Sequence, residues 1–189
     1  MDTQPVLVTD RLLLRPFDVA DAPVVQRLCG DYAVAATTLL PYPYPDGLAE
    51  VWIASLSEGI ERGEAAAFAV TVPPEGNLIG GVRLQIDRVH ARGELGFWVG
   101  RPCWGRGYAT EAVGAVIEYG FSVLGLHRVY AVHFSRNPAS GRVMEKCGML
   151  REGRFREHVR KWGVYEDVDV WGIIREPAFR TGTRIPSPL

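Results

Sequence analysis

A glycine-containing loop in the second half of the chain has the residue types and spacing best suited to chemistry. It reads Trp-Gly-Arg-Gly-Tyr-Ala over residues 104–109, between a strand-like apolar run and a helical pattern that begins at Thr110. Gly105 and Gly107 permit a tight turn, and the free N–H groups and positive dipole end of the following helix attract anions. This pattern predicts a phosphate site, above all for a diphosphate, to which Arg106 adds a charge and Thr110 a hydroxyl.

The loop is a weak signal when taken alone, because most short Gly-x-Gly segments are plain turns. The third glycine of the dinucleotide-binding fingerprint does not follow it, and the Gly-Lys-Ser/Thr of a Walker A loop is absent. Those two motifs are therefore excluded, and a plain turn stays the alternative to a phosphate site.

Length and composition limit the kinds of protein that the chain can be. A chain of 189 residues favours a single domain. With 47% apolar and 23% charged residues, it is unlike collagen, low-complexity disorder or a disulfide scaffold. The net charge of −1 gives no sign of a nucleic-acid partner.

Cysteine usage and the apolar runs indicate the compartment. The three cysteines, Cys29, Cys103 and Cys147, have no Cys-x-x-Cys spacing, which favours reduced thiols. No apolar run reaches the roughly 18 residues of a membrane span, and the N-terminus lacks the pattern of a signal peptide. We therefore expect a cytoplasmic protein that does not bind membranes.

The elements that must position the loop follow from apolar spacing and turn residues. Helices are expected at about 18–28, 48–62, 110–124 and 138–147. Strands are expected at about 11–17, 66–72, 78–86, 94–99, 127–133, 150–160 and 168–174. This order predicts an α+β fold, a mixed and mostly antiparallel twisted sheet with helices on both faces. We expect one domain over 1–189, with a core at about 9–176 and a loose tail after Pro177.

Two segments have turn or bulge residues. Three prolines alternate with tyrosines in residues 39–47, which excludes a helix interior or a central strand. We expect an ordered loop there that displays its aromatic side chains. Gly80 and Gly81, inside an expected strand, predict a bulge or a close backbone contact.

Two longer stretches resemble a known family. The segments GELGFWVGRPCWGRGYATEAV and HRVYAVHFSRNPASGRVMEKCGM are similar to the GCN5-related N-acetyltransferase (GNAT) superfamily. Within it, they resemble the branch of ribosomal-protein alanine and serine N-acetyltransferases, as do the LPYPYP and RLLLRPF segments. The resemblance spans roughly residues 9–176. Its specificity comes from the combination of the glycine loop, the Asn-x-x-Ser helix start and the Glu-Lys-Cys-Gly-Met helix end.

The resemblance implies acetyl-CoA as cosubstrate, without a metal, in a cleft between two splayed parallel strands, here 94–99 and 127–133. The pantetheine arm would pair with the backbone groups of Phe97, Trp98 and Val99, as another strand would. The diphosphate would be held by Gly105, Arg106, Gly107, Tyr108, Ala109 and Thr110. Asn137 would bind the pantetheine, and Arg142 the nucleotide phosphates.

Two positions depart from the common pattern of the family. Trp104 stands where Gln or Arg is usual, which fits the ribosomal-protein branch. Met144 stands where many members have a tyrosine as general acid, and methionine has no proton to donate. Ser140, one turn earlier, is the nearest polar replacement.

Acetyl transfer to an amine needs a base, because a primary amine is mostly protonated at pH 7. Glu94 is the predicted base. We expect it to have apolar surroundings, because burial makes a carboxylate a stronger base. The alternative is a solvated carboxylate in a turn. The predicted oxyanion donor is a backbone N–H near Phe97 or Trp98. Ser140 is the predicted donor to the leaving thiolate, with a helix-cap hydroxyl as the alternative.

Several other side chains have a functional and a structural interpretation. Cys103 could be a nucleophile, but a lone cysteine is more often a small apolar residue. His133 could be a base, but on an apolar strand it is more often structural. Glu111 could be catalytic, but in a first helical turn an acidic residue more often complements the helix dipole. The aromatic residues that could line the acceptor groove, or else pack against the core, are Tyr42, Tyr44 and Trp52.

The sequence thus predicts an N-acetyltransferase that acts by direct attack in a ternary complex, with a protein N-terminal α-amine as acceptor. Two alternatives stay open: a small amine such as an antibiotic, polyamine or amino acid, and a non-catalytic acetyl-CoA sensor. The resemblance also implies a homodimer, which is common in this branch.

Overall fold

A computed structural model describes residues 4–175, and its strands form one eight-stranded sheet in the order β1-β2-β3-β4-β5-β6-β8-β7. The strands are β1 (Leu7–Val8), β2 (Leu13–Pro16), β3 (Ala65–Val72), β4 (Asn77–Asp87), β5 (Arg92–Val99), β6 (Arg128–Phe134), β7 (Leu150–Lys161) and β8 (Val164–Ile174). The β5–β6 pair is parallel, and the other neighbouring pairs in the described chain are antiparallel. The expected mixed, mostly antiparallel sheet is confirmed.

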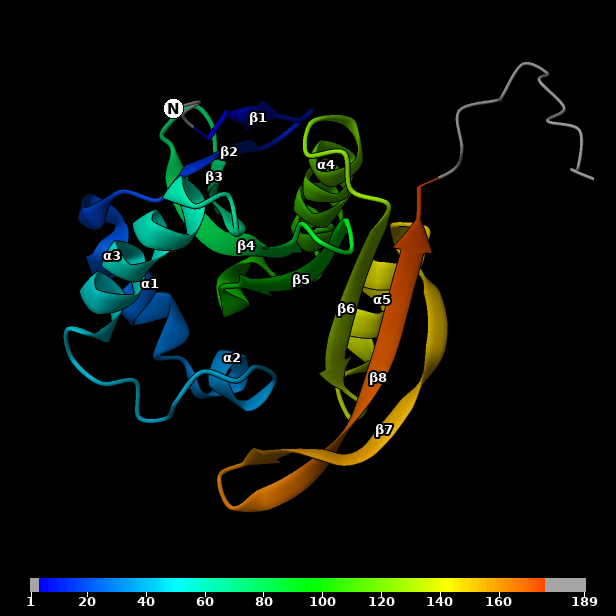
Figure 1. Cartoon of the computed structure of the whole chain (residues 1–189). Helices are drawn as coiled ribbons and strands as arrows, with labels where there is room; N and C mark the ends of the chain where they lie inside the picture. Colours follow the sequence, from blue (N-terminus) through cyan, green and yellow to red (C-terminus); the bar gives the residue numbers. More distant parts are fainter. Residues whose placement is uncertain (1–3, 176–189) are drawn as a thin grey trace, which may run out of the picture.

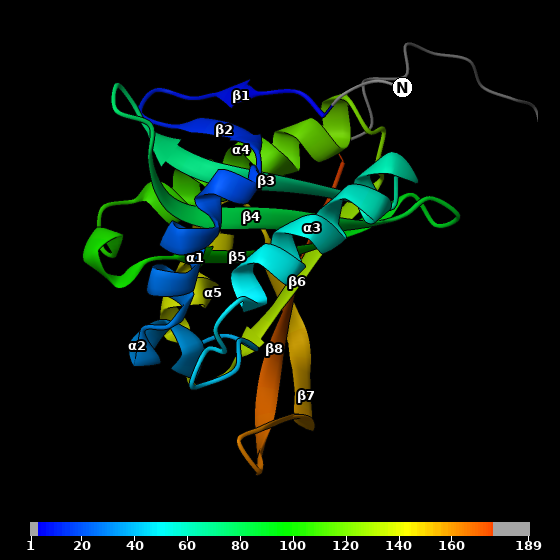
Figure 2. The same cartoon turned by 90° about the vertical axis from the view of Figure 1, so that its left-hand side faces the viewer.

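Helices cover both faces of this sheet (Figures 1 and 2). They are α1 (Ala22–Cys29), α2 (Tyr32–Ala36), α3 (Leu48–Glu61), α4 (Tyr108–Ser122) and α5 (Pro138–Lys146), with short 3-10 turns at η1 (Val19–Asp21) and η2 (Arg101–Cys103). Helices α1 and α3 lie on one face, and α4 and α5 lie on the other. The α+β class with helices on both faces is therefore confirmed.

Each face of the sheet has its own apolar core, because successive side chains of a strand point to opposite faces. Phe68 of β3 belongs to the larger core, where it meets Tyr119 of α4 edge-on at a centroid distance of 5.5 Å. Its neighbour Ala69 belongs to the smaller core, with Val25 of α1 and Ile53 of α3. The larger core fixes α4, and therefore the loop that precedes α4, against β3, β4 and β5.

The expected helices and strands are all present, within a few residues of their predicted ends. Two short elements were missed, β1 and α2, because two and five residues carry too little periodicity to be recognised. Helix α2 begins at a cap, where the Asp31 carboxylate accepts the Ala33 amide at 2.7 Å. Across residues 4–175 no helix combines the length and apolar character that a membrane crossing needs. The predicted tail after Pro177 lies outside the described residues.

Gly80 and Gly81 lie on β4, between Val70 and Ala69 of β3 and Val99 and Trp98 of β5. The β3–β4 register shifts between Val70 and Thr71, opposite Gly80. A Cβ atom at Gly80 would lie 2.4 Å from the Trp98 carbonyl oxygen, and one at Gly81 would lie 2.9 Å from the Phe17 ring. Both the predicted bulge and the predicted close contact are confirmed.

The close contact at Gly80 predicts that a larger residue there lowers the stability of the fold. Gly80→Ala should lower the free energy of unfolding by about 2 kcal/mol or more, because the added methyl group collides with backbone. The matched control is Gly96→Ala in β5, where an added Cβ meets no atom within 4 Å. Thermal unfolding followed by circular dichroism should show a loss of about 5 °C for Gly80→Ala and little change for the control. Equal melting temperatures for the two variants would contradict the close approach of Gly80 to the Trp98 carbonyl.

Candidate active site

The parallel strands β5 and β6 stay paired for only a short distance. Their register joins Arg92 to Arg128, Gly93 to Val129 and Glu94 to Tyr130. Beyond Glu94, β5 continues along β4 as far as Val99, while β6 continues along β8 (Figure 1). The predicted splay is confirmed, and it leaves the edge of β5 after Glu94 without a neighbouring strand.

The β4–β5 ladder determines which backbone groups face this gap. The Gly100 amide donates to the Ile79 carbonyl at 2.8 Å, so Val99 and Gly80 form a non-hydrogen-bonded antiparallel pair. The N–H and C=O of Val99, and those of Phe97 two residues earlier, therefore point away from β4 into the gap.

Two of the predicted backbone contacts differ from expectation. The backbone of Trp98 faces β4, opposite Gly81, so the register directs its N–H and C=O away from the gap in which a pantetheine arm was expected. The Val99 carbonyl accepts the Trp104 indole N–H at 2.6 Å. Val99 and Phe97 both face the gap, but the Val99 carbonyl is already bonded to Trp104, whereas both backbone groups of Phe97 stay open to a ligand.

The glycine loop has the conformation that an anion site needs. Gly105 and Gly107 both have positive φ, at 73° and 81°, and Gly107 is the residue that precedes the first turn of α4. Within residues 4–175 no side chain caps this helix end, so the first amides of α4 are available to an anion. Arg11 holds the loop from behind, because its guanidinium donates to the Arg106 carbonyl at 3.0 Å.

A cavity of about 320 Å³, here called the loop cavity, lies between this loop and the start of α5. Its lining includes Phe97, Trp98, Val99, Gly105, Gly107, Tyr108, Ala109, Thr110, Asn137, Ser140 and Arg142, all predicted, together with Lys146. The Arg106 side chain is exposed and is not among the lining residues. Lys146 was missed, although its position four residues after Arg142 puts both cations on one helical face.

These features fit acetyl-CoA. Helix amides and two cationic side chains suit phosphate groups, and an open strand edge suits the amides of a pantetheine arm.

A second cavity, here called the sheet cavity, has a volume of about 470 Å³ and is lined by Arg83, Gln85, Glu94 and Gly96 among others. It shares Thr37, Thr38, Phe97 and Ser140 with the loop cavity. The two threonines follow α2, the helix that sequence reasoning missed. The two cavities therefore meet at Phe97 and Ser140.

Glu94 is exposed, so the expectation of apolar surroundings is wrong. Its partner across the β4–β5 ladder is Gln85, and its partner on β6 is Tyr130, whose hydroxyl donates to Glu94 Oε2 at 2.9 Å. Burial, and then the hydrogen bond to Glu94, raise the pKa of Tyr130, so this phenol keeps its proton as a donor. The Tyr130 phenol therefore orients the exposed Glu94 carboxylate.

Ser140 and Asn137 are joined at the start of α5. Asn137 Nδ2 donates to Ser140 Oγ at 2.9 Å, which leaves the serine proton free to be donated elsewhere. Ser140 lies inside α5 after Pro138, so it is not the residue that caps the helix. Met144, one turn further on, is buried in the larger core.

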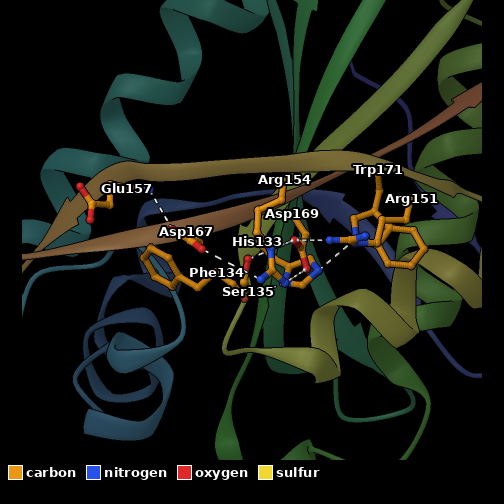
Figure 3. A network of polar contacts seen from close by, with 9 residues as sticks. All are labelled: His133, Phe134, Ser135, Arg151, Arg154, Glu157, Asp167, Asp169 and Trp171. Atoms are coloured by element: carbon orange, nitrogen blue, oxygen red, sulfur yellow. Dashed lines mark hydrogen bonds and ion pairs between the residues drawn. The ribbon is translucent and has the colours of Figure 1, made fainter.

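His133 is structural. Its Nε2 accepts the Trp171 indole N–H at 3.0 Å, and its Nδ1 donates to the Phe134 carbonyl at 2.7 Å, so both ring nitrogens are occupied (Figure 3). Beside it, the Arg154 guanidinium is the main cause that holds the pKa of Asp169 well below its usual range. This network ties β6, β8 and β7 together.

Glu111 and Cys103 also have structural surroundings. Glu111 accepts the Thr9 hydroxyl at 2.6 Å and pairs with Arg11 at 2.6 Å. Burial opposes ionisation of Glu111, but the hydrogen bonds from Thr9 and Arg11 outweigh it and lower its pKa. Cys103 is half-buried, lines the loop cavity and packs against the larger core.

The three aromatic residues predicted for the acceptor groove are dispersed. Tyr44 is buried in the smaller core, where burial raises its pKa to about 12, so the expectation that it is displayed is wrong. Trp52 packs edge-on against Phe17 at 4.9 Å in the same core. Tyr42 is exposed and meets Tyr32 at a centroid distance of 5.2 Å. None of the three lines the loop or sheet cavity formed by residues 4–175.

The model of the acetyltransferase (GNAT) domain family matches residues 11–150. The chain belongs to the GNAT family. It is an acetyl-CoA-dependent N-acetyltransferase.

Relatives of this GNAT protein cover nearly its whole length. An uncharacterised N-acetyltransferase of Bacillus licheniformis, p20, is 30% identical over 89% of this chain and 96% of its own. The ribosomal protein uS5-alanine N-acetyltransferase of Escherichia coli is 28% identical, with coverage of 85% and 86%. The structure of spermidine N-acetyltransferase from Vibrio cholerae in complex with CoA and spermine has a TM-score of 0.76 at 25% identity, with coverage of 88% and 96%.

The two cations of the loop cavity can be tested directly. Arg142→Gln and Lys146→Gln should each weaken CoA binding about threefold to tenfold, because each removes one positive charge from the lining of the loop cavity. Isothermal titration calorimetry at low and high salt should show a larger effect at low salt. Arg156→Gln, an exposed charge on β7 outside the cavity, is the control. Unchanged affinity in both cavity variants would show that these cations do not contact the coenzyme.

Proposed function

We propose that the protein transfers the acetyl group of acetyl-CoA to a protein N-terminal α-amine, by direct attack in a ternary complex. The observation that carries this proposal is the meeting of the loop cavity and the sheet cavity at Phe97 and Ser140. Two cavities that meet can hold donor and acceptor together, so that attack needs no covalent enzyme intermediate.

The acceptor class is supported by one relative and by the exposure of Glu94. The uS5-alanine N-acetyltransferase aligns over most of the chain, and its name states a protein substrate. The Glu94 carboxylate is exposed on the sheet face, so the terminus of a large substrate can reach it. The similarity to the structure of spermidine N-acetyltransferase from Vibrio cholerae supports a small amine as the second candidate acceptor.

Glu94 acts as the base in this proposal. Its carboxylate accepts a proton from the acceptor ammonium, directly or through one water molecule. Tyr130 donates to Oε2 and leaves Oε1 for that proton. Tyr130 is thus a positioning residue that acts through Glu94.

Phe97 and Ser140 act on the thioester side. Acetyl-CoA supplies an acetyl group that is activated for attack by its thioester bond. The Phe97 N–H, directed into the gap, stabilises negative charge on the carbonyl oxygen. The Ser140 hydroxyl, held by Asn137, donates its proton or a hydrogen bond toward the departing sulfur.

The role of Glu94 makes a prediction about turnover. Glu94→Gln should lower kcat about 100-fold without weakening CoA binding, because the amide has the same shape and no basic oxygen. Tyr130→Phe should lower kcat about threefold to tenfold, and it should have no further effect in the Glu94→Gln background. The measurement is thiol release in steady state. Full activity of Glu94→Gln would remove it as the base, and additive effects would remove Tyr130 as its positioning residue.

Ser140 can be tested in the same assay. Ser140→Ala should lower kcat about tenfold to 100-fold, because the departing sulfur loses its donor. The KM for acetyl-CoA should change little. Ser140→Thr, which keeps a hydroxyl, should retain more activity than the alanine variant, and equal activities would remove Ser140 from the proton path.

The proposed function is tested by an acceptor screen with acetyl-CoA. N-terminal peptides, polyamines and aminoglycosides are supplied in turn, and released thiol is measured. We expect turnover with peptides. Turnover with small amines alone would favour the second candidate, and absence of turnover with every amine would favour a sensor.

A further inference from the structure

Arg83 is a charged side chain of the sheet cavity that the proposed mechanism does not use. It lies on β4, is exposed, and lines the cavity together with Glu94. Eight arginines form ion pairs with carboxylates in residues 4–175, and Arg83 is not one of them. Its charge is therefore available to a ligand.

The sheet register places Arg83 and Glu94 on the same face. Gln85 lies opposite Glu94, and Arg83 lies opposite Gly96. Because side chains two residues apart on a strand point to the same face, all four positions lie on one face of the sheet. Arg83 and Glu94 are diagonal neighbours across the ladder, about 7–8 Å apart at the backbone. Gly96 lies between them and has no atom within 4 Å of its ideal Cβ position, which leaves the surface between the two charges open.

Gln85 holds the Arg83 side chain in place. Its Oε1 accepts from Arg83 Nη2 at 2.6 Å, and its Nε2 donates to the Glu64 carbonyl at 2.9 Å. This contact uses one of the five guanidinium N–H donors and carries no negative charge. The rest of the guanidinium stays free to bind an anionic group.

From this arrangement we infer that Arg83 forms an anion subsite, so that the preferred acceptor carries a carboxylate near its reacting amine. This inference rests on the proposed function and specifies its substrate. An extended peptide rises about 3.3 Å per residue, so an α-amine at Glu94 places an acidic side chain of its second or third residue within reach of Arg83. The acceptor is therefore an N-terminal segment with an acidic residue at its second or third position.

The charges of the cavity disfavour a polyamine. Among the described residues that line the sheet cavity, Glu94 is the carboxylate and Arg83 is the cation that opposes it. A polyamine would bring its second positive charge toward Arg83, and like charges at short range repel. An acidic peptide instead satisfies both side chains.

The test uses three peptides that differ only at the second residue, Glu, Gln or Lys, and compares their kcat/KM. The unmodified protein should prefer Glu over Gln, and Gln over Lys. Arg83→Gln should lower kcat/KM for the Glu peptide about fivefold to tenfold and leave the Gln peptide within about twofold. Arg83→Glu should reverse the order and favour the Lys peptide. Arg156→Gln, the same change outside the cavity, should alter none of the three values.

The outcomes separate this inference from the proposed function. Turnover of the three peptides at equal efficiency, or an equal loss for all three in Arg83→Gln, would overturn the anion subsite and leave the transfer to peptide amines intact. Preference for spermidine over every peptide would overturn the subsite, because Arg83 would then face a cation. Failure to acetylate any amine would overturn the proposed function, and the subsite with it. Circular dichroism of each variant checks that the substitution of an exposed side chain leaves the fold unchanged.

Discussion

The edge of β5 beyond Glu94 is the constraint on which the site depends. Backbone N–H and C=O groups at a buried edge must find partners, yet β6 pairs with β5 only as far as Glu94. The groups of Phe97 are left facing a cavity, and the amides at the start of α4 open into the same cavity. A ligand that carries both amides and phosphates completes hydrogen bonding that the protein itself leaves unfinished.

Packing on either side keeps this edge open. On one side, α4 is fixed by the larger core and by Glu111, which ties its first turn to Thr9 and Arg11. On the other side, β6 is held by β8 through its whole length. Lys161 of β7 donates to the Leu40 carbonyl, so the β7–β8 hairpin also supports the proline-rich loop. Burial of the Lys161 ammonium group, and to a lesser extent the positive charge of Arg136, lower the pKa of Lys161.

Sequence reasoning predicted what depends on local pattern and missed what depends on pairing. The glycine loop and the long helices follow from spacing and from turn residues within single segments, whereas the splay of the two parallel strands was implied by the family resemblance. The exposure of Glu94 depends on Gln85 across the ladder, and the backbone direction of Trp98 depends on the β4–β5 register. The burial of Tyr44 depends on how α1 and α3 meet. Lys146 could have been found, because four-residue spacing from Arg142 is a local signal.

The β4 sequence itself explains why one part of this face is covered and the next is open. Gly81 lies beneath Phe17 and Trp98, where a side chain on β4 would block the packing of the smaller core. Two and four residues later the same face carries Arg83 and Gln85, which are exposed. A helix laid over these two residues would have to desolvate a guanidinium, which is costly without a paired charge. The change from glycine to polar residues therefore ends the helical cover beside Glu94, where an acceptor must approach.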